Sequence, residues 1–142
     1  MKVKKRNVAI YIDGPNFLRK EYNIDLSEIM RIGKKYGKIT IAKVFVNQFA
    51  PQKLIEAILN EGFECLTFLA EREDADIDVP LAIDALETAL TKDVDVFILC
   101  TKDTDFFSLV KKIKERGKIV VIVGVENIPS SLKNSADYIE IL

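Results

Sequence analysis

Short apolar runs rich in β-branched residues alternate with longer segments of helical periodicity along the chain of 142 residues. The expected strands occupy residues 7–12, 38–47, 63–70, 95–101, 118–124 and 137–142. The expected helices occupy residues 16–22, 25–37, 51–62, 78–90, 105–117 and 129–136. Strands that alternate with helices in this way favour a parallel sheet covered on both faces. We therefore predict a single domain over residues 1–142, an α/β fold with a three-layer α/β/α sandwich and a mainly parallel, Rossmann-like sheet.

The amino-acid composition narrows the chemistry that the chain can perform. It contains no histidine, which excludes Ser-His and Cys-His nucleophilic systems and zinc sites with histidine ligands. Catalysis would then rest on carboxylates, lysines, tyrosines, hydroxyls or metal-bound water. Cys65 and Cys100 both lie in apolar strand segments, where we expect small buried hydrophobic residues rather than a disulfide or a catalytic thiol.

The net charge of −1 gives no overall attraction to nucleic acid. The basic runs at residues 1–6, 31–35 and 111–118 fit either a local nucleic-acid surface or solvated helix faces and ends, and the sequence leaves both open. The longest apolar runs are strand-length, shorter than the roughly 20 residues that span a bilayer, so we expect no membrane partner. No signal-peptide pattern follows the basic start, and we expect a cytoplasmic protein.

Aspartates follow two of the expected strands. Asp13 ends the first strand, and Asp103 and Asp105 follow the fourth. In open α/β sheets, sites form beyond the carboxyl ends of the strands where the strand order reverses, so these acids converge if the two strands are neighbours. Two carboxylates about 4 Å apart repel by roughly 4 kcal/mol at an effective dielectric of about 20, which Mg²⁺ or Mn²⁺ relieves through oxygen ligation.

A further carboxylate is expected from the start of the central helix. Pro80 is best tolerated in a first helical turn, which places Asp78 at the amino end of that helix. Asp84 lies about 120° further around the helix and is less suited to the same ion. Asp76 fits a capping residue or a merely repelling charge.

Each of these aspartates, taken singly, also fits a cap or a surface position. Their combination at equivalent strand ends favours a site. Asn16 fits either an amide that orients an acid or a phosphate, or a helix cap. Thr101 fits a hydroxyl donor to a carboxylate or phosphate. Lys102 fits a phosphate contact, although solvation is the stronger alternative for a lysine taken by itself. Asp93 and Asp95 precede the fourth strand and are expected to be turn residues at the opposite edge.

Four segments, in order, resemble the signatures of the NYN domain family, a branch of the PIN-like ribonuclease superfamily. They read YIDGPNF, DIDVPLAIDAL, TKDTDFFSLVKKIKERGKIVVIVG and SSLKNSADYIEIL. The resemblance runs from about residue 7 to the C-terminus and implies a PIN-like sheet and metal-dependent RNA endonuclease activity. It implies catalytic roles for Asp13, Asp78, Asp103 and Asp105, with the first three holding Mg²⁺ or Mn²⁺ and Asp105 either completing the acidic cluster or aligning the attacking water.

The resemblance also implies a substrate and leaves alternatives open. Asn16, Thr101 and Lys102 would contact single-stranded or structured RNA, and Lys102 stands where the family often has a small residue. A homodimer is possible in this scheme. The alternatives are an inactive RNA-binding or regulatory module and, less favoured, a metal-dependent phosphatase. Phe106 and Phe107 are expected to anchor the acidic loop in the core.

Overall fold

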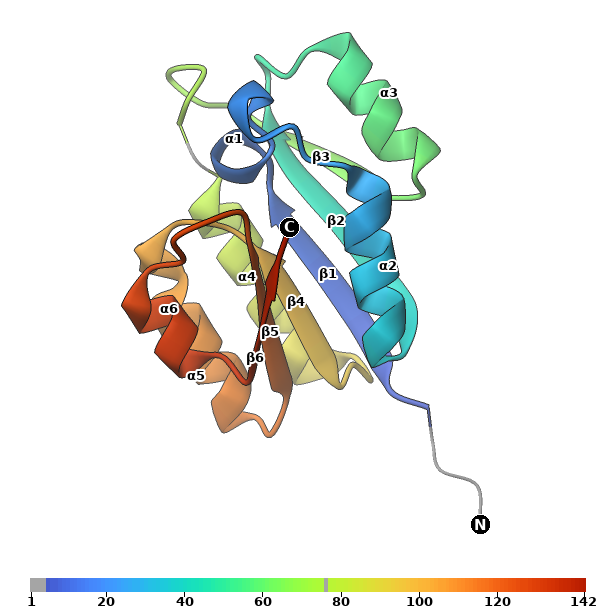
Figure 1. Cartoon of the computed structure of the whole chain (residues 1–142), viewed down its shortest axis with the longest axis vertical. Helices are drawn as coiled ribbons and strands as arrows, with labels where there is room; N and C mark the ends of the chain where they lie inside the picture. Colours follow the sequence, from blue (N-terminus) through green and yellow to red (C-terminus); the bar gives the residue numbers. More distant parts are fainter. Residues whose placement is uncertain (1–4, 76) are drawn as a thin grey trace.

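A parallel sheet forms the centre of the computed structural model, which describes residues 5–75 and 77–142 (Figure 1). The N-terminal basic residues 1–4 and Asp76, for which roles are predicted above, lie outside the described residues. Within them the strand order is β3-β2-β1-β4-β5-β6, with every neighbouring pair parallel. The strands are β1 (Asn7–Asp13), β2 (Lys38–Asn47), β3 (Glu64–Phe68), β4 (Val96–Cys100), β5 (Ile119–Gly124) and β6 (Tyr138–Ile141).

Helices cover both faces of the sheet, which confirms the predicted three-layer sandwich (Figure 1). One face carries α1 (Gly14–Phe17), α2 (Leu26–Tyr36) and α3 (Gln52–Asn60). The other carries α4 (Asp78–Thr91), α5 (Phe107–Glu115) and α6 (Ser130–Ser135). The helix predicted over residues 16–22 is divided into α1 and a 3-10 turn, η1 (Lys20–Tyr22), because so short a segment gains little from helix propagation. A second 3-10 turn, η2 (Thr104–Phe106), precedes α5.

Side chains of strand β1 contribute to two hydrophobic cores, one on each face of the sheet. Val8, Ile10 and Ile12 pack on the face of α2 and α3. Ala9 and Tyr11 pack on the face of α4 and α5. Side chains alternate between the faces of a strand, so burial on both faces explains why this segment is apolar almost throughout. The same alternation directs Asp13, two residues after Tyr11, toward the α4 face.

The strand order reverses between β1 and β4. The chain moves outward from β1 through β2 to β3, and then α4 carries it back across the sheet to β4 on the other side of β1. Strands β1 and β4 are direct hydrogen-bonded neighbours, with Ile12 opposite Cys100. The adjacency on which the expected convergence depends is therefore present, and the loops after these two strands lie at the reversal point.

Several smaller expectations can be compared with the structure. Cys65 and Cys100 are free thiols, half-buried and buried respectively, and burial raises the pKa of both. Phe106 is buried, but Phe107 is 38% exposed, so its predicted role as a core anchor is wrong. Phe107 begins α5 after the 3-10 turn, and this change of helical geometry turns its ring outward. None of the described helices has the length and apolarity needed to cross a bilayer.

Candidate metal centre

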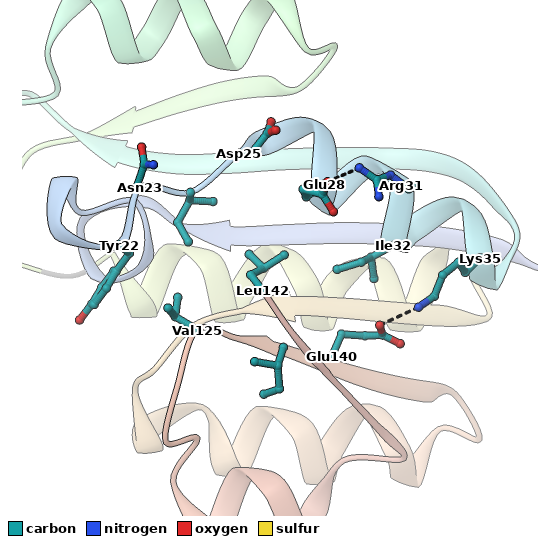
Figure 2. Close-up of a pocket in the computed structure, with 12 residues that line it drawn as sticks. Tyr22, Asn23, Asp25, Glu28, Arg31, Ile32, Lys35, Val125, Glu140 and Leu142 are labelled. Carbon is teal, nitrogen blue, oxygen red and sulfur yellow. Dashed lines mark hydrogen bonds and ion pairs between the residues drawn. The ribbon is translucent and has the colours of Figure 1, made fainter.

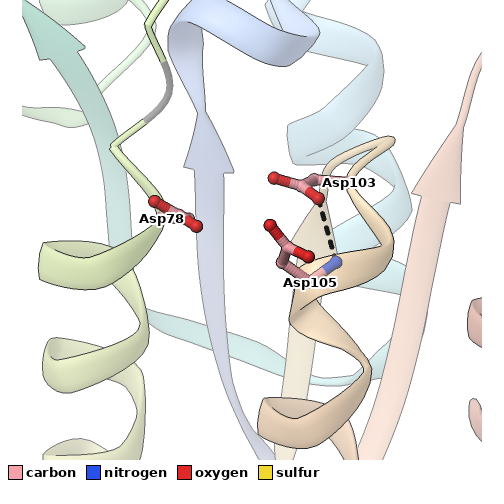
Figure 3. Close-up of side chains that lie close together, drawn as sticks. All are labelled: Asp78, Asp103 and Asp105. Atoms are coloured by element: carbon pink, nitrogen blue, oxygen red, sulfur yellow. Dashed lines mark hydrogen bonds between the residues drawn. The ribbon is translucent and has the colours of Figure 1, made fainter.

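Three carboxylates gather at the reversal point of the sheet (Figure 3). Asp78, Asp103 and Asp105 each offer an oxygen atom, and these atoms all lie within 4.8 Å of one another. Asp78 is the first residue of α4, whereas Asp103 and Asp105 lie at the start of η2. Figure 3 shows the side chains directed toward one another from these two elements. The convergence joins acids that are 25 or more positions apart in the sequence.

The loop after β4 directs two acids to the same place. Asp103 is the N-cap of η2, and its Oδ1 accepts the backbone N–H of Asp105 at 2.9 Å. This bond turns the chain so that both side chains approach Asp78 (Figure 3). The sequence presented a cap and a site as alternatives for Asp103. The structure shows a capping residue that also contributes an oxygen to the acidic group.

Asp78 lies where a carboxylate is well tolerated. Its Oδ1 accepts the N–H of Val79 at 3.0 Å, and the preceding N-cap, Ile77, supplies no side-chain hydrogen bond. The positive end of the helix dipole stabilises an acid in a first turn by about 0.3–1 kcal/mol. Pro80 occupies that turn, as predicted, because the N–H it lacks has no helical partner there.

Asp13 is placed differently from the other predicted acids. It is fully buried at the end of β1, and it is not one of the three residues whose oxygens lie within 4.8 Å. The alternation of the strand directs it toward the face on which α4 begins. The structure therefore brings together three of the four predicted catalytic acids, and Asp105, which was not predicted as a direct ligand, is among them.

Asn16 and Thr101 support the acidic loop through their side-chain oxygens. Asn16 Oδ1 accepts the N–H of Lys102 at 2.6 Å and the hydroxyl of Thr101 at 3.3 Å. The Thr101 hydroxyl oxygen in turn accepts the N–H of Asp103 at 3.1 Å. These two residues, predicted to contact substrate, connect α1 to the backbone that carries Asp103.

Lys102 is directed toward a tyrosine. Its Nζ donates to the hydroxyl of Tyr22 at 2.8 Å and lies 4.3 Å from the centre of that ring. A phosphate contact, as predicted, would require the ammonium group to leave this position. Tyr22 was not singled out from the sequence, because no local pattern relates it to a lysine 80 positions away.

A second polar group lies beneath α4. Asp84 accepts the hydroxyl of Tyr11 at 2.8 Å and the ammonium group of Lys43 at 2.8 and 3.0 Å. Burial raises the pKa of Tyr11 well above its ordinary value of 10, so the hydroxyl stays protonated and can donate. Asp84 is thus engaged away from the three carboxylates, as its helical position predicted. At the opposite sheet edge, Asp95 accepts the N–H of Asn7 at 2.8 Å, consistent with its predicted turn role.

A hollow of about 400 Å³ lies between α2 and the C-terminal strand β6 (Figure 2). Two of its acids pair with neighbouring basic side chains. Lys35 Nζ lies 2.7 Å from Glu140 Oε1, and Arg31 pairs with Glu28. Tyr36 also donates its hydroxyl to Glu140 at 2.6 Å. Glu28 and Glu140 therefore have their charges compensated within the protein.

Comparison with known proteins agrees with the architecture and with the predicted family. The profile of the NYN domain family matches residues 7–142. This chain belongs to the NYN domain family. The match includes both strand ends that meet at the reversal point and the whole of α4.

Two of the similar proteins are described without a named activity. The chain is 42% identical over 143 residues to the uncharacterized protein MJ0482 of Methanocaldococcus jannaschii. The match covers 97% of this NYN chain but only 58% of that relative's length. The crystal structure of VPA0982 from Vibrio parahaemolyticus, a protein of unknown function, matches with a TM-score of 0.82 and 28% identity. That match covers 100% of this chain and 96% of the other.

Proposed function

We propose that this NYN domain is a metal-dependent RNA endonuclease that hydrolyses phosphodiester bonds. The observation that carries the proposal is the convergence of Asp78, Asp103 and Asp105 at the reversal point of the sheet. Mg²⁺ and Mn²⁺ prefer oxygen ligands, and Mg²⁺ takes them at about 2.0–2.1 Å, so oxygens bound to one ion lie within about 4.2 Å of each other. Carboxylate oxygens within 4.8 Å reach that spacing by small side-chain rotations.

The protein's own residues then have separate tasks. Asp78 and Asp103 hold the ion, and Asp105 completes the oxygen set or orients the attacking water. Asp13 is buried at the end of β1, and the ligand role implied for it by the family belongs to this proposal. Asn16 and Thr101 fix the backbone of the acidic loop. A bound divalent ion would supply an acidified water and charge stabilisation at the phosphate.

The proposed substrate is RNA, either single-stranded or structured. Support comes from membership of the NYN family together with the acidic centre formed by Asp78, Asp103 and Asp105. Lys102 is the nearest candidate for a backbone contact, because it directly precedes Asp103 and can exchange its bond to Tyr22 for one to phosphate. Contacts of this kind position a strand without reading its bases, so we expect weak sequence preference.

The test compares purified wild-type protein with matched Asp→Asn variants on a panel of labelled RNAs, with Mn²⁺, Mg²⁺ or EDTA. We expect Asp78→Asn, Asp103→Asn and Asp13→Asn to lose cleavage by about 10²–10³-fold, the size of effect seen when one electrostatic stabiliser is removed. Asp25→Asn is the matched control. Asp25 caps α2 through Ser27, away from the centre, and asparagine caps equally well.

The outcomes separate the candidate functions. Equal metal-dependent cleavage by the wild type and all three variants would reject these residues as the catalytic centre. RNA binding without cleavage on the whole panel would support a non-enzymatic binding module. Hydrolysis confined to small phosphoesters would support the phosphatase alternative.

A further inference from the structure

The contact between α4 and the sheet contains one charged group in otherwise apolar surroundings. Asp84 binds Tyr11 of β1 and Lys43 of β2, and the Tyr11 hydroxyl also lies 2.8 Å from the hydroxyl of Thr88, one turn further along α4. The side chains of Lys43 and Asp84 are only 22% and 27% exposed. A partly desolvated ion pair is often no more stabilising than apolar residues of similar size, so its role here is not explained by stability.

The two strands hold Asp84 in one place. Tyr11 and Lys43 are register partners on β1 and β2, so their polar ends are presented side by side. The Tyr11 ring lies between Phe45 and Phe97, with ring centres 6.1 and 6.4 Å away and nearly parallel planes. This packing limits the ring to one orientation. The Tyr11 hydroxyl therefore has a fixed position relative to the sheet.

Asp78 depends on the placement of the same helix. It lies six residues before Asp84, which is about 9 Å along the helix axis. Among the residues that the structure describes, the N-cap of α4, Ile77, makes no side-chain hydrogen bond and is held by apolar packing. The remaining contacts of α4 are mainly apolar and non-directional, whereas hydrogen bonds fix both rotation and translation.

We propose that Tyr11, Lys43 and Asp84 form a positioning clamp. The clamp sets the place of Asp78 relative to Asp103 and Asp105, and thereby sets the affinity of the acidic centre for a divalent cation. This inference rests on the proposed function, because it takes the three carboxylates to be a cation site. The clamp residues touch neither the ion nor the substrate, and they act through α4.

The test measures Mn²⁺ binding to the full chain by titration calorimetry without RNA. Tyr11→Phe removes the hydroxyl but keeps the stacked ring, and we expect the Kd for Mn²⁺ to rise about tenfold, as for other residues that orient metal ligands. Tyr36→Phe is the matched control. It removes a hydroxyl that donates to Glu140 at 2.6 Å on the other side of the sheet, and it should leave the Kd unchanged. Urea unfolding of both variants shows whether their losses of stability are comparable.

Three further variants keep the inference testable if Tyr11→Phe folds poorly. Lys43→Met keeps the length of the side chain without its charge, and should also weaken Mn²⁺ binding. Asp84→Asn keeps an oxygen that accepts from Tyr11, so it should bind Mn²⁺ more tightly than Asp84→Ala. Equal Mn²⁺ affinity in the wild type, Tyr11→Phe and Lys43→Met would overturn the clamp alone. A wild type that binds no Mn²⁺ would overturn the clamp and the proposed function together.

Discussion

The acidic centre and the hollow between α2 and β6 handle negative charge in opposite ways. In the hollow, Glu140 pairs with Lys35, and Glu28 pairs with Arg31 (Figure 2). At the centre, three carboxylates approach one another, and Asp78 and Asp105 form no ion pair within residues 5–75 and 77–142 (Figure 3). An acid paired with a base stabilises the folded state, whereas carboxylates that lie close to one another destabilise it unless a cation binds between them. The comparison separates charges that stabilise the fold from charges that are available to the proposed cation.

The largest expected effect that tests this difference is the stabilisation of the folded protein by a bound metal ion. Mn²⁺ at about 100 times its Kd should raise the free energy of unfolding of the wild type by about 2.7 kcal/mol, since it binds the folded state only. Asp103→Asn should lose most of this gain, because it lacks one of the three carboxylates. Urea unfolding with Mn²⁺ and with EDTA provides the measurement.

The matched variant for this experiment is Glu140→Gln, which alters an acid of the hollow. It should keep the full metal-dependent gain, because Glu140 lies outside the acidic centre. If Mn²⁺ stabilised all three proteins equally, the ion would be binding elsewhere. The distinction between the two regions would then be lost.

The next largest effect concerns Asn16, which supports the backbone of the acidic centre. Asn16→Ala should lower the free energy of unfolding by about 1–3 kcal/mol, because the N–H of Lys102 and the hydroxyl of Thr101 lose their common acceptor. It should also weaken Mn²⁺ binding by loosening the backbone of Asp103. Asn134→Ala, at an exposed position of α6, is the control and should change neither quantity. A loss of stability without any change in Mn²⁺ affinity would make Asn16 purely structural.

Periodicity in the sequence was sufficient to predict the fold. Strands such as β1 and β5 are buried on both faces, so they are apolar runs that only a covered parallel sheet explains. The rule that relates sites to strand order directed attention to the acids at the ends of β1 and β4, on the condition that these strands are neighbours, and the pairing of β1 with β4 meets that condition. Local chemistry also placed Asp78 correctly, because Pro80 restricts where the helix can begin.

The pairings between distant side chains could not be predicted in this way. In the sequence, Lys43 is a single polar residue within a predicted strand, and Tyr11 is a single aromatic residue within an apolar one. Their shared partner, Asp84, is 41 and 73 positions away, and the pairing depends on how α4 crosses the sheet. The bond between Lys102 and Tyr22 depends in the same way on the path of the chain after α1. Side-chain orientation at this level is a property of packing, which no local pattern encodes.

The smallest expected effect comes from Glu140→Gln, which breaks the ion pair with Lys35 in the hollow. This effect depends on pH. Burial alone would raise the pKa of Glu140, but hydrogen bonds from Lys35 and Tyr36 outweigh it and hold the pKa below its usual value of 4.5. A carboxyl with a lowered folded-state pKa stabilises the protein above its unfolded pKa, and this contribution is lost as the pH falls through the folded value. Glu140→Gln should therefore lower the free energy of unfolding at pH 7 by about 0.5–1 kcal/mol.

The difference between the wild type and Glu140→Gln should shrink as the pH falls below 4.5, because protonated Glu140 resembles the glutamine. Urea unfolding of both proteins from pH 7 to acid pH measures it, with EDTA present so that metal binding does not contribute. A difference that stayed constant over this range would mean that the glutamate acts by shape and not by charge. The hollow would then no longer be the charge-paired counterpart of the acidic centre.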